Sequence, residues 1–167
     1  MKSVFKKMAI VVIVAVTMNV AAYAQEKGDM AVGGNLVFGS GDSYSNVGIG
    51  AKFQYNVTKP IRLEGSFTYF LEKDYLSMWD LSINGHYLIP VADKITVYPL
   101  AGLGMLGWKA DYGFGIGSVS DSEFGFNLGG GCDFKLSDRL ILNAELKYKI
   151  GGDLDRLLLS AGIAYKF

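Results

Sequence analysis

Charged side chains that alternate with apolar ones are the residues of this chain whose types and spacing could support chemistry. Ten of them share the polar side of segments that otherwise carry apolar residues at every second position. They are Lys52, Arg62, Lys147, Lys149 and Lys166, together with Glu64, Asp80, Glu123, Asp133 and Glu145. Opposite charges that share a confined interior persist only when they are paired and hydrogen-bonded. We therefore expect these residues to form a network of ion pairs.

His86 is the only histidine and Cys132 the only cysteine of the chain. A zinc-type site needs several ligands at characteristic spacing, and neither residue has a Cys or His partner at such a spacing. We therefore predict no metal and no cofactor, and we interpret His86 as a hydrogen-bonded interior side chain rather than a catalytic one. Cys132 cannot form an intramolecular disulfide and is expected to pack as a small apolar residue.

Eight segments of the chain alternate with the period of two that is typical of β-strands. They span residues 30–39, 47–56, 61–71, 78–89, 95–108, 123–134, 140–150 and 157–167. One face of these segments contains no Asp, Glu, Lys or Arg, as expected of a surface that faces lipid. The other face carries the charges and many glycines, which suits a cramped polar lumen. The pattern predicts an all-β protein, an eight-stranded antiparallel up-and-down transmembrane β-barrel.

Two functions are open to the ten charges inside such a barrel. If they pair across the lumen they close it, and neutralising Arg62 or Glu64 should destabilise the barrel without opening it. If the pairs exchange partners, they form a gated, ion-sized pathway instead. We favour the closed lumen, because eight strands leave an interior just wide enough for side chains to fill.

Aromatic residues fall near both ends of the predicted strands. Phe38, Tyr69, Trp79, Phe124 and Tyr148 lie near the outer ends, and Tyr55, Tyr87, Phe134, Tyr165 and Phe167 near the periplasmic ends. Two girdles of amphipathic rings bracket the apolar band of a membrane barrel. Pro99 departs from the pattern, and because proline cannot donate a ladder hydrogen bond we expect a bulge or a local edge there.

Short turns alternate with longer connections along the chain. The turns span residues 57–60, 90–94 and 135–139, and the other set spans 40–46, 72–75, 109–122 and 151–156. Long loops of such barrels face outside and short turns face the periplasm. The longest connection, 109–122, carries Tyr112 and Phe114 among Gly and Ser. We interpret it as a surface loop without a fixed ligand; contact with a partner or with lipopolysaccharide is the alternative.

The first 24 residues have the three parts of a secretory signal peptide. Lys2, Lys6 and Lys7 precede a short apolar run, and Ala22-Tyr23-Ala24 forms a small-x-small cleavage site. We predict one domain after cleavage, the barrel at residues 25–167, without a lipoprotein anchor because residue 25 is Gln. The whole chain has a formal net charge of zero and no basic block, so nucleic acid is not an expected partner.

The signal peptide, the eight alternating strands and the terminal Phe167 resemble the small eight-stranded outer-membrane barrels, including the OmpX-like proteins and the OmpA transmembrane domain. The segments 98–105 and 162–167 are also similar to theirs. The resemblance implies a monomer in the bacterial outer membrane, contacts with outer-membrane lipid and lipopolysaccharide, and recognition of the last strand by the barrel-insertion machinery. Some similar barrels are lipid A deacylases or acyltransferases; the deacylases place a Ser and a His on the lipid face, which has neither here, so we predict no enzyme.

Three alternative functions are consistent with the sequence. The preferred one is a structural, envelope-integrity or surface-interaction role with a filled lumen. A narrow ion or small-solute pore would require a conducting lumen. A soluble periplasmic, lipocalin-like binder would place the apolar face inside, and alternation by itself does not say which face is inside.

Overall fold

The computed structural model describes residues 27–41, 45–73, 76–111, 118–151 and 155–167. The predicted signal peptide lies outside the described residues, so its cleavage stays a prediction. The described residues form no helix that is long and apolar enough to cross a membrane. Their strands are β1 (Met30–Gly41), β2 (Ser45–Asn56), β3 (Ile61–Lys73), β4 (Leu76–Tyr87), β5 (Ile89–Ala92), β6 (Ile95–Asp111), β7 (Ser118–Lys135), β8 (Leu140–Ile150) and β9 (Arg156–Lys166).

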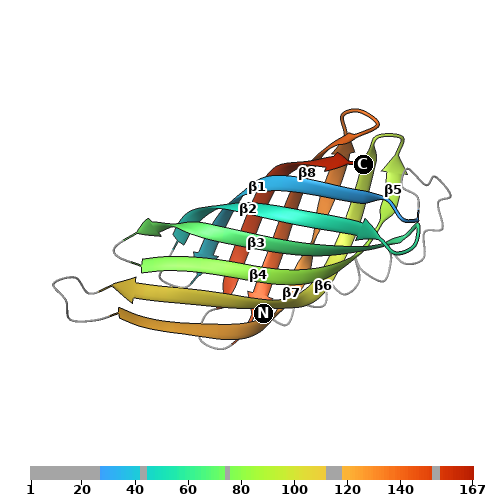
Figure 1. Ribbon diagram of the computed structural model, residues 1–167. Helices are drawn as coiled ribbons and strands as arrows, with labels where there is room; N and C mark the ends of the chain where they lie inside the picture. The colour runs from blue at the N-terminus through green and yellow to red at the C-terminus, as the bar shows by residue number, and fades with distance from the viewer. Residues whose placement is uncertain (1–26, 42–44, 74–75, 112–117, 152–154) are drawn as a thin grey trace.

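The strands form one closed antiparallel barrel (Figure 1). β1 to β4 pair in chain order, β4 pairs with β6, and β6 to β9 again pair in chain order. β1 also pairs with β9, which closes the sheet. β4 and β5 both pair with β6 and are separated only by Leu88, so together they count as one of the eight strands of the barrel wall. The structure therefore confirms the predicted all-β, eight-stranded up-and-down barrel.

The polar face of the strands lies inside the barrel and the apolar face lies outside. Burial alternates residue by residue along β8, from exposed Leu140 and buried Ile141 onward. Leu36 and Ile83 on the outer wall are 62% and 65% exposed, whereas Arg62 inside is 1% exposed. A soluble binder of hydrophobic ligands needs the opposite arrangement, so the lipocalin-like alternative is wrong for this chain.

The β6–β7 hairpin is longer than predicted and extends further than the other strands (Figure 1). Its pairing continues to Asp111 opposite Ser118, so both ends of the predicted loop 109–122 are strand. The apolar alternation ends at Trp108, and backbone pairing beyond that point does not require an apolar face. Tyr112 and Phe114 of the predicted loop lie outside the described residues.

Pro99 causes a break in the neighbouring strand rather than a bulge in its own. The pairing of β6 with β7 continues through Pro99 opposite Gly130 without a register shift. On the other side of β6, pairing is interrupted around Leu88, and the pairs next to the break keep the same register. Of the two predicted outcomes, the local edge is confirmed and the bulge is not formed, because a missing backbone N–H needs only the loss of pairing on one side of the strand.

Candidate functional site

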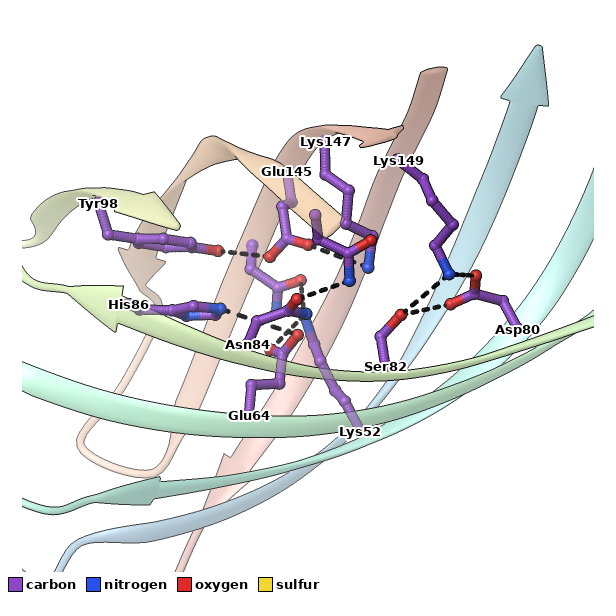
Figure 2. A network of polar contacts seen from close by, with 12 residues as sticks. Lys52, Glu64, Asp80, Ser82, Asn84, His86, Tyr98, Glu145, Lys147 and Lys149 are labelled. Atoms are coloured by element: carbon purple, nitrogen blue, oxygen red, sulfur yellow. Dashed lines mark hydrogen bonds and ion pairs between the residues drawn. The ribbon is translucent and has the colours of Figure 1, made fainter. Parts of the chain in front are cut away.

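The first group of charges in the lumen lies between β4 and β8. Lys149 on β8 forms an ion pair with Asp80 on β4. Ser82, also on β4, donates a hydrogen bond of 2.6 Å to the other oxygen of the same carboxylate. Figure 2 shows Lys149 pointing across the lumen toward both residues. Both charged side chains are buried. Their pairing across the lumen therefore avoids two isolated charges in the interior of the barrel.

The second group joins β2, β3 and β8. Lys52 Nζ lies 3.7 Å from Glu64 Oε2 and donates a hydrogen bond of 2.6 Å to Asn143 Oδ1. Gln54 donates to the same Glu64 oxygen at 2.7 Å. Each buried charge therefore has an opposite charge and at least one neutral hydrogen-bond partner, as buried ions require.

Glu145 joins Lys147 to a buried tyrosine (Figure 2). Its carboxylate lies 3.8 Å from Lys147 Nζ and accepts a hydrogen bond of 3.3 Å from the Tyr98 hydroxyl. Tyr98 is not among the predicted lumen residues. Its position between Val97 and Pro99, which both belong to the outer face, nevertheless places it on the lumen side of β6. The strand parity was a sufficient signal, but an aromatic residue was not expected on the polar face.

Arg62 is the centre of a third group near the short turns. Its Nη1 donates a hydrogen bond of 2.6 Å to Asp133 Oδ2, and its Nε donates to His86 Nδ1 at 3.2 Å. The guanidinium carbon lies 4.7 Å from the centroid of the Tyr98 ring, which itself stacks on His86 at 4.5 Å. A guanidinium in this position is held by an anion, an imidazole and an aromatic face together.

Glu64, His86 and Glu145 bring possible metal-ligand atoms within 4.8 Å of one another. Their surroundings do not fit a metal site. Because Arg62 donates to Nδ1 of His86, the neutral ring carries its proton on Nε2, which then has no lone pair for a metal. Both carboxylates also have lysine partners. The three side chains are therefore arranged as members of a charge-paired network.

An apolar layer fills the lumen on the side of the longer connections. Its buried members are Val37, Phe70, Met78, Leu106 and Leu158. Arg156 lies over the Phe70 ring at 4.6 Å and donates a hydrogen bond to Asn46 at 2.5 Å. These residues were missed because the polar face was expected to be polar throughout. Arg156 belongs to β9, so its assignment to the connection 151–156 was wrong.

Eight of the ten predicted charges lie in the lumen, and two do not join them. Lys166 forms an ion pair of 2.9 Å with Asp29 at the end of the barrel, with 29% of its side chain exposed. Glu123 is half-buried on β7, close to the extended end of the hairpin. Both residues have the correct parity, but Lys166 is the last residue of β9 and Glu123 lies on the part of β7 that extends beyond β8, so neither is fully enclosed by the wall.

The ten predicted interface aromatics point away from the lumen. Eight are exposed, and Tyr55 and Trp79 are half-buried. Trp79 stacks on Phe67 with ring centroids 6.4 Å apart. Cys132 is exposed on the same outer wall. An apolar outer wall around a closed, charged interior is the arrangement of a barrel that lies in lipid.

The sequence model of the protein family described as outer membrane protein beta-barrel domain matches residues 8–167 of this chain. The chain belongs to this family. Family membership gives a location in the bacterial outer membrane. No curated protein is significantly similar to the chain in sequence.

Solved structures of other outer-membrane proteins share the fold of this barrel. The N-terminal β-barrel domain of Pseudomonas aeruginosa OprF is 14% identical, with a TM-score of 0.72 over 86% of this chain and 100% of that one. Yersinia pestis Ail, the attachment invasion locus protein, is 21% identical, with a TM-score of 0.61 over 84% and 99%. Neisserial surface protein A is 16% identical, with a TM-score of 0.66 over 83% and 96%. At these identities the likeness describes the fold of this barrel and no specific role.

Proposed function

We propose that this protein is a non-enzymatic, monomeric barrel of the outer membrane with a closed lumen and a structural role in the envelope. The supporting observation is the filling of the lumen by two different kinds of layer. Paired charges occupy the middle, and the apolar layer around Phe70 lies toward the longer connections. A space beside Lys52, Asp80 and Lys147 has a volume of about 10 Å³, which is no more than one water needs.

The absence of catalysis in this proposal rests on His86. The ring is 1% exposed and is held inside the lumen by Arg62 and Tyr98. A general base must reach a substrate proton at hydrogen-bond distance. We also propose that outer-membrane lipid and lipopolysaccharide surround the wall, that the ten aromatics mark the membrane interfaces, and that the insertion machinery recognises the last strand.

Conductance tests the closed lumen. In planar bilayers we expect no single-channel steps from the wild type or from Lys149→Ala, because the apolar layer still blocks the lumen of the variant. We expect no steps from the double variant Lys149→Ala/Phe70→Ala either, because the Lys52–Glu64 pair and the group around Arg62 still fill the lumen. A difference in gel migration between unboiled and boiled samples verifies that each protein is folded. Regular steps from the folded wild type would replace the structural proposal with the pore.

A second candidate function, surface interaction, is supported by the free edge of β7. Pairing between β7 and β8 begins only at Phe126 opposite Ile150. Residues 118–123 of β7 therefore have β6 on one side and no strand among the described residues on the other. Unpaired N–H and C=O groups of an edge strand can bind an extended segment of another protein. Asp121 and Glu123 make this edge acidic, so we propose a basic extended segment as the partner.

Charge reversal at this edge should weaken such binding. We expect an eight-residue peptide of alternating Lys and Val to bind the detergent-folded protein, as measured by fluorescence anisotropy. Asp121→Lys/Glu123→Lys should weaken the affinity by about tenfold or more, since like charges then oppose one another. Asp138→Lys, a reversal in the turn between β7 and β8, is the matched control and should bind as the wild type does. Equal peptide affinities of the wild type and both variants would argue against binding at this edge.

A further inference from the structure

The outer wall of the barrel contains an apolar hollow with a volume of about 380 Å³. It lies where β3, β4, β6 and β7 run side by side. The residues that line it include Ile61, Gly85, Tyr87, Pro99, Ala101 and Leu128. The volume lies in the range of about 300–1,000 Å³ that is usual for small-molecule sites.

Small residues at the centre of the hollow explain its depth. Gly85 pairs with Ala101, so these two neighbouring outward positions carry no side chain and a single methyl group, and the compact ring of Pro99 occupies the next outward position of β6. Tyr87 and larger aliphatic residues stand at the margin. All of these positions belong to the outward, apolar face, so an occupant must come from the membrane itself.

The hollow lies close to the short turns and therefore in the periplasmic leaflet. Ile61 is the first residue of β3, and Tyr87 is the last residue of β4. At a rise of about 3.3 Å per residue, Lys59 lies about 7 Å from Ile61. Lys59 is exposed in the turn before β3, whereas Lys94 lines the mouth of the lumen with Asp133. The hydrocarbon part of one leaflet is about 15 Å thick, so a lipid that fills the hollow has its headgroup near Lys59.

We propose that the hollow binds one acyl chain of an anionic phospholipid of the periplasmic leaflet, and that Lys59 binds its phosphate group. The apolar lining matches the chain, and the ammonium group complements the negative headgroup. A hollow without a lipid chain would leave a void against the membrane, because no other side chain of the described wall enters it. The proposal requires only that the barrel lies in the membrane, and it does not depend on whether the lumen conducts.

Native mass spectrometry of the detergent-folded protein tests the proposal with two added lipids, phosphatidylglycerol and phosphatidylcholine with identical chains. We expect a one-to-one adduct on the wild type with a preference for phosphatidylglycerol. Gly85→Leu fills the hollow and should reduce the adduct at least fivefold. The fold should tolerate it, because a Cβ at Gly85 would have its nearest neighbour, the Ala101 carbonyl oxygen, at 3.7 Å.

Gly34→Leu is the matched control on β1. Gly34 is also an outward glycine, and an added Cβ would have Gly50 O as its nearest neighbour at 3.8 Å. This variant should retain the adduct in full. Lys59→Gln should keep an adduct but lose the preference for phosphatidylglycerol.

Three results would overturn the proposal. The first is an adduct on Gly85→Leu equal to that of the wild type, and the second is an equal loss in Gly34→Leu. The third is a dimer of the wild type that Gly85→Leu abolishes, since the hollow would then be filled by a second copy. A wild-type adduct that shows no preference between the lipids would remove the role of Lys59.

Discussion

Replacing Arg62 with methionine should lower the free energy of unfolding by about 3–5 kcal/mol, because it leaves a buried carboxylate without its partner. Arg62 supplies the only hydrogen bond to Asp133 Oδ2 found among the described residues, and Asp133 Oδ1 has no partner there. Asp133 is 3% exposed, so water cannot replace the guanidinium without rearrangement. Urea titration of the protein folded in detergent, with the folded fraction read from unboiled gels, measures the effect.

Two further variants show whether the loss comes from the unpaired charge. Arg62→Met/Asp133→Leu removes both charges and should recover most of the stability, because a buried ion pair is often replaceable by apolar residues of similar size. Arg139→Gln removes an exposed arginine and should change stability by about 0.5 kcal/mol or less. A double variant as unstable as Arg62→Met would contradict the interpretation and assign the effect to the loss of packing on Tyr98 and His86.

Replacing Phe70 with alanine should cost about 3–5 kcal/mol, which is the usual range for removing a buried aromatic ring. Phe70 is fully buried in the apolar layer and also supports the Arg156 guanidinium. The cavity cannot collapse easily, because the surrounding side chains project from a closed and hydrogen-bonded wall. The same urea titration measures the change, and bilayer recordings should show no conductance while the Lys149–Asp80 pair remains.

Phe53→Ala is the matched control on the outer wall. Phe53 is 45% exposed and faces lipid, so an acyl chain can occupy the space that its ring leaves. We expect a loss of about 1 kcal/mol or less. If both variants are destabilised equally, the apolar layer has no special role in closing the lumen.

The class of fold could be predicted almost entirely from local patterns. Alternation with a period of two assigns each side chain to one of two faces, whatever the strand pairs with. By this rule Lys52, Glu64 and Lys149 share one face, and Leu36 and Phe53 share the other. The rule does not say how far a position lies along the barrel, and this explains why Glu123, on the part of β7 that extends beyond β8, and Lys166, at the end of β9, lie apart from the network.

The partners of the charges could not be predicted in the same way. Arg62 meets Asp133 across 71 residues of sequence, and Lys149 meets Asp80 across 69. Such pairs depend on the registers of several strands at once, and alternation contains no information about register. Tyr98 and Phe70 were missed for a related reason, since the lumen selects side chains by the space between opposite walls as well as by polarity.

The sequence by itself determined the export signal as a prediction, the eight strands of the wall, the two faces of each strand and the polar or apolar character of each face, because these features are local. Tertiary structure alone decided which face is inside, which charges pair, where the lumen is apolar, and that β6 and β7 extend beyond their neighbours. It also decided that Gly85 and Ala101 lie side by side in a hollow. These features depend on closure of the sheet, which brings together residues that no local pattern relates.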